Sequence, residues 1–343
     1  MNREELTALI NEAGKEAITY PDTDLKKKLK RYIKKVLKYH YYPRDLINWP
    51  NALLALSLIE NNAAKEVQQE FLDQWIKEGK KVRGVENAIA GKVFLDMGTP
   101  EGDEAATYIF NYLINEAKDY KGSFIYNPNK KEEYVFVDML GMICPFMAEY
   151  GKKKGNEIAR KLSEIQLKNF IKFGIDEDSG LPFHAYEYKS FEKLGLVGWG
   201  RAVGWLMMGE AGYLEYAPAG GEYYDRIINH FIKFTDTVFE YQNEDGLFGW
   251  KLAHGDVRAD TSSTAMILNA ALSGIVDSGV LDKEKYADKI RLGFEGLKVY
   301  AKGGKVYEAS AESLGLGIHP DIYGAYPWSL GPFLSLVSRI DKL

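Results

Sequence analysis

The chain has 343 residues, of which 46% are hydrophobic and 27% are charged, so it holds enough apolar material for a sizeable core. Its net charge of −5 disfavours a dedicated nucleic-acid binder, because such proteins are usually basic. No apolar run approaches the length of a membrane span, which disfavours an integral membrane protein.

The N-terminus begins Met1-Asn2-Arg3-Glu4-Glu5-Leu6, which is charged and lacks the apolar segment of a secretory signal. We therefore expect a cytoplasmic protein. Residues 26–35 form a basic run whose apolar neighbours recur at helical spacing, which favours a solvated helix face over a phosphate-binding patch. The chain has one cysteine, Cys144, in an apolar stretch, so we expect a buried structural thiol and no internal disulfide.

Helical periodicity runs along the whole chain. We predict a helix that begins near Leu25, after the N-capping oxygens of residues 22–24, followed by helices at 51–61, 64–80, 85–97, 101–119, 136–150, 156–173, 203–216, 223–241, 261–278, 283–300 and 325–340. Four longer segments, at 122–134, 176–198, 243–260 and 303–323, are rich in Gly and aromatic residues and are candidates for short strands. If successive helices alternate in direction, all four segments lie at one end of the molecule.

A series of helices without a βαβ pattern or an obvious linker predicts helical hairpins arranged in a ring, in which neighbours cover one another's apolar faces. We expect an all-α fold in which residues 1–343 form a single toroidal domain. An open α-solenoid is the alternative.

Asp138 is a lone carboxylate within an apolar run over residues 134–142. Two interpretations are open for it. The side chain could cap a helix or sit hydrogen-bonded in the core. It could instead be a general acid that burial keeps protonated.

Residues 198–209 combine Trp199, Arg201 and Trp205 with several glycines. Glycine lets the backbone approach a ligand closely, and the planar donor fork of Arg suits carboxylates and hydroxyls. A well-packed helix start with a cation–π contact explains the same residues. Upstream, His184 lies among aromatic residues, where it could orient a sugar hydroxyl, tune a carboxylate or play a structural part.

The other histidines show no metal-ligand spacing; they are His40, His230, His254 and His319. The sequence also lacks a phosphate-binding loop, a nucleophile elbow and a dinucleotide fingerprint, which disfavours phosphoryl-transfer and nicotinamide enzymes. Near the C-terminus, residues 308–315 and 324–332 bring hydroxyls, backbone amides and Trp328 to a helix start. Such a place can hold an anion, although capping and turn roles explain these residues equally well.

Together these segments resemble the unsaturated glucuronyl and rhamnogalacturonyl hydrolases of glycoside hydrolase families 88 and 105, with the closer likeness to family 105. The specific matches are the helix that contains Val137-Asp138-Met139 and the segment Trp199-Gly200-Arg201. Trp49 ahead of residues 52–56, and the stretch 260–266, support the resemblance.

The resemblance implies an (α/α)6 barrel of six helical hairpins, with no metal and no cofactor. It also implies a small saccharide substrate that ends in an unsaturated uronic acid. Asp138 would protonate C4 of the C4=C5 double bond and help to deliver water to C5, after which the hemiketal collapses and releases the neighbouring sugar. The sugar site would be lined by Trp49, His184, Trp199, Arg201, Trp205 and Trp328.

The family places a second Asp on an early helix, a few residues before a glycine, and the chain departs from that pattern. Here residues 84–91 offer Glu86 as the preferred counterpart and Asn87, which cannot ionise, as the alternative contact. A Glu displaces the carboxylate by one methylene, and a misplacement of about 1 Å can lower a rate roughly a hundredfold. Two other hypotheses stay open. A sugar epimerase or isomerase can share this fold, but the histidine acid/base pair that it would use cannot be identified in the sequence. A sugar-binding protein that has lost turnover is supported only by the change at Glu86 and Asn87.

Overall fold

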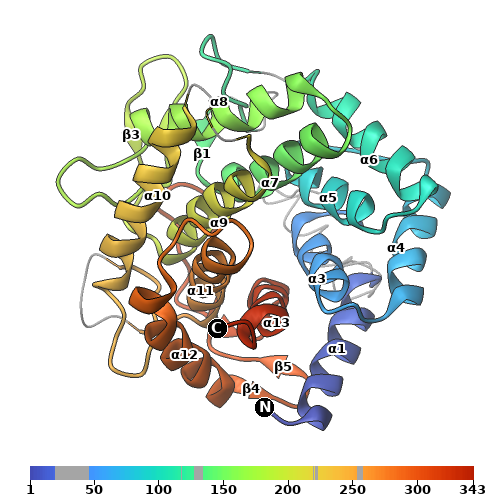
Figure 1. Ribbon diagram of the computed structural model, residues 1–343, viewed down its shortest axis with the longest axis vertical. Coiled ribbons are helices and arrows are strands. Elements are labelled where there is room, and N and C mark those ends of the chain that lie inside the picture. Colours follow the sequence, from blue (N-terminus) through green and yellow to red (C-terminus); the bar gives the residue numbers. More distant parts are fainter. Residues whose placement is uncertain (20–45, 117, 127–133, 219, 221–222, 253–257) are drawn as a thin grey trace, which may run out of the picture.

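The computed structural model describes residues 1–19, 46–116, 118–126, 134–218, 220, 223–252 and 258–343 (Figure 1). The predicted helix near Leu25, the basic run at 26–35, His40 and His254 lie outside the described residues.

The described residues form twelve α-helices in two concentric rings (Figure 1). The inner ring consists of α3 (Trp49–Glu60), α5 (Ala88–Asp96), α7 (Asp138–Lys153), α9 (Gly200–Tyr216), α11 (Thr261–Val276) and α13 (Pro327–Ile340). The outer ring consists of α1 (Arg3–Ala17), α4 (Lys65–Lys77), α6 (Pro100–Leu113), α8 (Glu157–Phe173), α10 (Tyr224–Phe239) and α12 (Lys283–Tyr300). Each inner helix packs on the next, and α13 packs on α3, so the inner ring is closed. The predicted (α/α)6 barrel is confirmed, and the open solenoid is excluded.

The two rings differ in how their helices are buried. In the inner helix α11, every residue from Thr261 to Gly274 is buried. The outer helix α10 buries Ile227, Phe231, Phe234 and Val238, which recur at three- and four-residue spacing. A helix that is apolar on all sides belongs in the interior, whereas an amphipathic one covers it from outside. The sequence pattern thus sets which helices form the inner ring.

Short strands occur between the helices. β1 (Tyr134–Phe136), β2 (Ala185–Glu187) and β3 (Lys193–Leu194) form an antiparallel sheet in which Phe136 pairs with Ala185. Two hairpins follow: β4 (Ala301–Lys302) with β5 (Lys305–Val306), and β6 (Ala309–Ser310) with β7 (Tyr323–Gly324). β1 leads into α7, β3 precedes α9 and β7 precedes α13, so these strands lie where inner helices begin.

Several helix boundaries differ from those predicted. Helix α1 was not predicted, although Asn2 and Glu5 form a capping box at its start. The helix predicted from residue 136 begins at Asp138, because residues 134–136 pair as β1 with β2. The helix predicted over 85–97 begins with a 3-10 turn, η1 (Val85–Asn87), and ends at Asp96.

The end of the barrel at which the inner helices finish is closed by ion pairs. Arg339 in α13 contacts Glu60 at the end of α3, at 2.9 Å, and Asp277 just after α11, at 2.8 Å. A cation near helix C-termini is favourable because the macrodipole is negative there.

Among the helices of the described residues, none is long and apolar enough to cross a membrane.

Helices α7 and α9 approach very closely at Gly141. A Cβ atom at Gly141 would lie 2.5 Å from Trp205 Cε3 and 2.8 Å from the Trp205 carbonyl oxygen. Trp205 is only 1% exposed, so its ring has no free space into which it can move. Glycine is therefore required for this helix–helix contact.

We expect Gly141→Ala to lower the free energy of unfolding by about 2 kcal/mol, as overpacking of a core does. Alanine would gain about 1 kcal/mol of helix propensity, but the contact with the Trp205 backbone outweighs that gain. Urea denaturation measures the change. Gly84→Ala is the matched control, because nothing lies within 4 Å of its added Cβ and its backbone is extended. Equal stability of the two variants would contradict this account of the α7–α9 contact.

Candidate active site

The beginnings of the inner helices meet at one end of the barrel. Trp49 starts α3, and its ring lies 5.3 Å from that of Trp328, the second residue of α13. Arg201, the second residue of α9, lies 5.7 Å from the Trp328 ring. Asp138 is the first residue of α7, and Asp260 is the N-cap of α11. Helix N-termini carry partial positive charge, so this end of the barrel favours negatively charged groups.

Asp138 and His184 lie side by side in this region. Asp138 Oδ2 is 3.3 Å from His184 Nε2, and the Asp138 side chain is 24% exposed while His184 is almost fully buried. The two residues are held together by the pairing of β1 with β2, since the Val137 amide donates to the His184 carbonyl at 3.0 Å. Asp138 is thus fixed by the backbone and still open to a ligand.

Glu86 is held by a tyrosine. The Tyr126 hydroxyl donates to Glu86 Oε2 at 2.9 Å. Burial raises the pKa of Tyr126 well above its usual value, and the charges of Glu86, Asp138 and Glu312 act in the same direction. Tyr126 therefore stays protonated and remains a hydrogen-bond donor. The three carboxylates whose charges act on this phenol are the carboxylate cluster of the site.

Asn87 is used by the protein backbone. Its Nδ2 donates to the Ile47 carbonyl at 2.9 Å, and its Oδ1 accepts from the Arg83 amide at 2.8 Å. The side chain is fully buried. Of the two candidates for the second carboxylate position, the geometry favours Glu86, and Asn87 holds the segment before α5 in place.

Arg201 is also bound by the protein. Nη1 donates to the carbonyl and hydroxyl oxygens of Ser310, at 2.9 and 2.5 Å, and Nη2 donates to the Ala311 carbonyl at 2.7 Å. Asp260 Oδ2 lies 3.7 Å from Arg201 Nη1. Burial lowers the pKa of the Arg201 guanidinium, an effect that Asp260 opposes. Arg201 therefore anchors the loop that follows β6, and its predicted contact with a sugar stays a prediction.

The predicted tryptophans differ in accessibility. Trp49 is partly exposed and packs edge-on against Trp205 at 5.7 Å. Trp199, Trp205 and Trp328 are buried, and Trp328 Nε1 donates to the Ser310 carbonyl at 3.0 Å. The structure brings all four to this end of the barrel, where Trp205 supports Trp49 from behind.

Sequence reasoning missed His319, which lies in the loop between β6 and β7. Its ring centroid is 5.0 Å from that of Trp199 and 5.9 Å from those of His184 and Trp250. Burial lowers the pKa of His319 to about 4, and the charges of His184 and Arg201 contribute. No motif could have placed it here, because the contact depends on how the loop folds back over α9.

A model of Glycosyl Hydrolase Family 88 matches residues 25–338. The chain belongs to glycosyl hydrolase family 88. The resemblance inferred from the Asp138 helix and the Trp199–Arg201 segment is thereby confirmed.

Individual relatives agree with the family assignment. The unsaturated rhamnogalacturonyl hydrolase YesR of Bacillus subtilis (strain 168) is 22% identical over 261 residues, which cover 72% of this chain and 76% of YesR. The structure resembles a family 105 glycoside hydrolase from C. acetobutylicum ATCC 824, with a TM-score of 0.72 and 20% identity. The match covers 92% of this chain and 98% of that protein. It also resembles the unsaturated glucuronyl hydrolase of Bacillus sp. GL1, with TM-score 0.72, 13% identity and coverage of 97% and 94%. At these identities the structural likeness shows the fold.

In this family 88 chain, three buried polar atoms of the site find no aligned hydrogen-bond partner among the described residues. They are Asp138 Oδ2, His184 Nδ1 and His319 Nε2. Buried polar atoms are normally hydrogen-bonded, because an unmade bond costs free energy. These three atoms belong to neighbouring residues, so the cluster is a candidate site for a ligand that would supply the missing partners.

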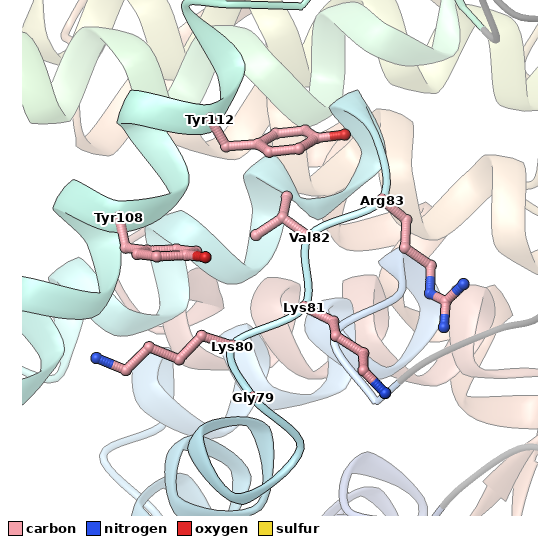
Figure 2. Close-up of a pocket in the computed structure, with 7 residues that line it drawn as sticks. All are labelled: Gly79, Lys80, Lys81, Val82, Arg83, Tyr108 and Tyr112. Carbon is pink, nitrogen blue, oxygen red and sulfur yellow. The ribbon is translucent and has the colours of Figure 1, made fainter.

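A separate hollow of about 500 Å³ lies at the edge of the family 88 barrel (Figure 2). Tyr108 and Tyr112 project from one helix with Val82 between them, and Lys80 extends toward Tyr108, at 5.9 Å from its ring centroid. Lys81 points away from the two tyrosines (Figure 2). The lining contains no carboxylate and no histidine; its titratable side chains are those of Lys80, Lys81, Arg83, Tyr108 and Tyr112.

The unusual state of His319 makes the stability of this family 88 chain depend on pH. The folded chain keeps His319 neutral down to about pH 4, whereas the unfolded chain takes up the proton near pH 6.5. The unfolded state then binds more protons, so the free energy of unfolding falls as pH falls from about 6.5 to 4. We expect the free energy of unfolding of His319→Gln to fall less than that of the wild type over this pH range. Urea denaturation at several pH values measures it. Parallel profiles for wild type and variant would contradict the assignment.

Proposed function

We propose that this family 88 chain hydrolyses small saccharides that end in an unsaturated uronic acid, by hydrating the C4=C5 double bond. The observation that carries the proposal is Asp138, a partly exposed carboxylate 3.3 Å from His184 at the end of the barrel where the inner helices begin. The family membership and the name of the relative YesR support the substrate class.

The proposed reaction requires one group that donates a proton and then accepts one. Asp138 gives its proton to C4, and the electron pair of the double bond forms the new C–H bond. The positive charge that develops at C5 is shared with the ring oxygen, and water attacks C5 while its proton returns to Asp138. The hemiketal opens to a ketone, and the hemiacetal left at C1 releases the neighbouring sugar as an alcohol.

The second carboxylate of the site fits this scheme. Glu86 accepts a hydrogen bond from Tyr126, so its orientation is fixed within the cluster that includes Asp138. A fixed negative charge beside developing positive charge stabilises a transition state. If Glu86, the preferred counterpart, occupies the position of the family's second Asp, that position keeps a carboxylate, which favours an enzyme over a sugar-binding protein without turnover.

A second candidate function has one observation in its favour. The sugar epimerase or isomerase hypothesis requires a histidine pair, and the ring centroids of His184 and His319 are 5.9 Å apart. The family membership favours the hydrolase. An epimerase would convert a saturated sugar into its stereoisomer without releasing an alcohol, so NMR of the products separates the two functions.

The ultraviolet absorbance of the C4=C5 chromophore tests the proposal. Unsaturated rhamnogalacturonyl, glucuronyl and galacturonyl disaccharides are incubated separately with the purified chain. We expect the absorbance to decay with at least one of them, and equimolar release of the neighbouring sugar. A constant absorbance with all three substrates would refute the proposed function, and the substrate that decays fastest names the specificity.

A further inference from the structure

The loop at residues 311–322 reaches across the site from the β6–β7 hairpin. The Ala311 amide donates to the Ile322 carbonyl at 2.8 Å, which closes the base of the loop. Arg201 Nη2 holds the Ala311 carbonyl at 2.7 Å. Leu316 lies near His184, since a Cβ atom added at Gly195 would be 3.1 Å from Leu316 Cδ2 and 2.9 Å from His184 Cβ. The loop is thus closed at its base and approaches His184 through Leu316.

His319 is the residue of this loop whose imidazole lies beside the site. It sits next to Trp199 and Trp250, and its charge state responds to His184, Arg201 and Asp138. Its Nε2 atom is buried and has no hydrogen-bond partner among the described residues. The surrounding rings provide flat apolar surface for a sugar face, but they leave this polar atom unsatisfied.

We propose that His319 is a specificity residue that hydrogen-bonds a hydroxyl group of the saccharide bound at Asp138. The inference rests on the proposed function for the identity of the reacting sugar. A neutral imidazole offers one donor and one acceptor, which matches a hydroxyl group that can both accept and donate.

The charges around His319 argue against a carboxylate as its partner. The acidic side chain that acts on His319 is that of Asp138, whose charge opposes the lowering of the His319 pKa. Arg201 is a cation that acts on His319, and its terminal nitrogens already donate to Ser310 and Ala311. A carboxylate of the substrate placed at His319 would meet a neutral ring and nearby negative charge, whereas a hydroxyl group carries no such penalty.

The test is a double-mutant-type cycle, in which His319 is replaced on the protein and single hydroxyl groups are removed from the substrate. Wild type, His319→Ala and His319→Gln are assayed with the parent unsaturated disaccharide, with its monodeoxy analogues and with its methyl ester. We expect one deoxygenation to lower kcat/KM of the wild type roughly 10- to 100-fold, as the loss of a buried hydrogen bond does. The same deoxygenation should change kcat/KM of His319→Ala less than about threefold, because the interaction is already absent. His319→Gln should restore part of the discrimination, since its amide also donates and accepts.

His230→Gln is the matched control. His230 lies on the outer helix α10 and contacts Glu210 at 2.6 Å, so its loss should leave the discrimination between parent and deoxy substrates unchanged. The proposal is overturned if each deoxygenation lowers kcat/KM of His319→Ala as much as it lowers kcat/KM of the wild type. It is also overturned if the methyl ester is the one substrate whose relative rate changes, because His319 would then recognise the carboxylate.

Failure of the proposed function gives a different result. If the wild type turns over none of the unsaturated disaccharides, the same cycle is measured as binding of saturated disaccharides and their deoxy analogues, through the fluorescence of Trp199 and Trp250 beside His319. Loss of discrimination in His319→Ala would then support the assigned contact without hydrolysis. Equal discrimination by wild type and variant, or no binding at all, would overturn it.

Discussion

Replacement of Asp138 by Asn is expected to lower kcat for the unsaturated disaccharide by roughly 10²- to 10⁴-fold, the usual contribution of a positioned acid or base. Asn has the same shape, so it keeps the place beside His184, but it can neither give a proton to C4 nor take one from water. Because Asp138 is already 24% exposed and fixed by the β1–β2 pairing, we expect KM and the unfolding midpoint to change little. The decay of the C4=C5 absorbance at saturating substrate measures kcat.

Asp176→Asn is the matched control for this prediction. Asp176 has the same chemistry but caps a turn through Ser179, so its kcat should stay within about twofold of wild type, as is usual away from the reacting atoms. A value of kcat for Asp138→Asn within threefold of wild type would show that another group supplies the proton, and Glu86 would be the next to test.

Asp260→Ala should be the most destabilising single substitution at this end of the barrel. Asp260 is fully buried and accepts from the amide of Ser262 at 2.9 Å and from the hydroxyl of Ser310 at 2.6 Å, with Arg201 Nη1 at 3.7 Å. Its removal leaves a buried guanidinium without its counter-charge and uncaps α11. Breaking a buried ion pair in this way costs about 3–5 kcal/mol. The urea unfolding midpoint measures the loss.

Two further variants separate the charge from the cap. Asp260→Asn keeps an oxygen that accepts from the Ser262 amide, so its loss of stability should be smaller than that of Asp260→Ala. The double variant Arg201→Met with Asp260→Ala removes both charges, and its loss should be well below the sum of the two single losses. Additive losses would show that Arg201 and Asp260 do not stabilise each other.

The fold could be predicted largely because burial and periodicity coincide in this chain. The periodicity of α11 and α10 predicted both helices, whereas their places in the two rings follow from burial, since α11 is buried on all sides and α10 on one side. The capping box of Asn2 and Glu5 indicates a helix start in the sequence, so α1 could also have been predicted. The start of α7 was not readable, because the residues before Asp138 form a strand only through β2, about fifty positions further along the chain.

The site was predictable where a residue type is rare for its surroundings. Asp138 stood out as one carboxylate in an apolar run, and the segment from Trp199 to Arg201 as aromatic and basic residues among glycines. The sequence left both Glu86 and Asn87 open, and no local pattern could show that Asn87 donates to the Ile47 carbonyl, 40 residues away. His319 needed them too, since a loop histidine has no periodicity to read.

The closed inner ring also constrains the order in which the chain acquires its structure. Arg339 of α13 meets Glu60 of α3 across 279 positions, and the Asn61 side chain donates to the Leu334 carbonyl across 273. Contacts this distant in sequence form late, because the entropy of closing the loop is lost before they stabilise anything. During synthesis on a ribosome, an apolar face of α3 therefore stays uncovered until α13 has been synthesised. Trp49 cannot contact Trp328 before that point. A nascent chain of this protein is most prone to aggregate just before α13 emerges, and that is when a chaperone would matter most.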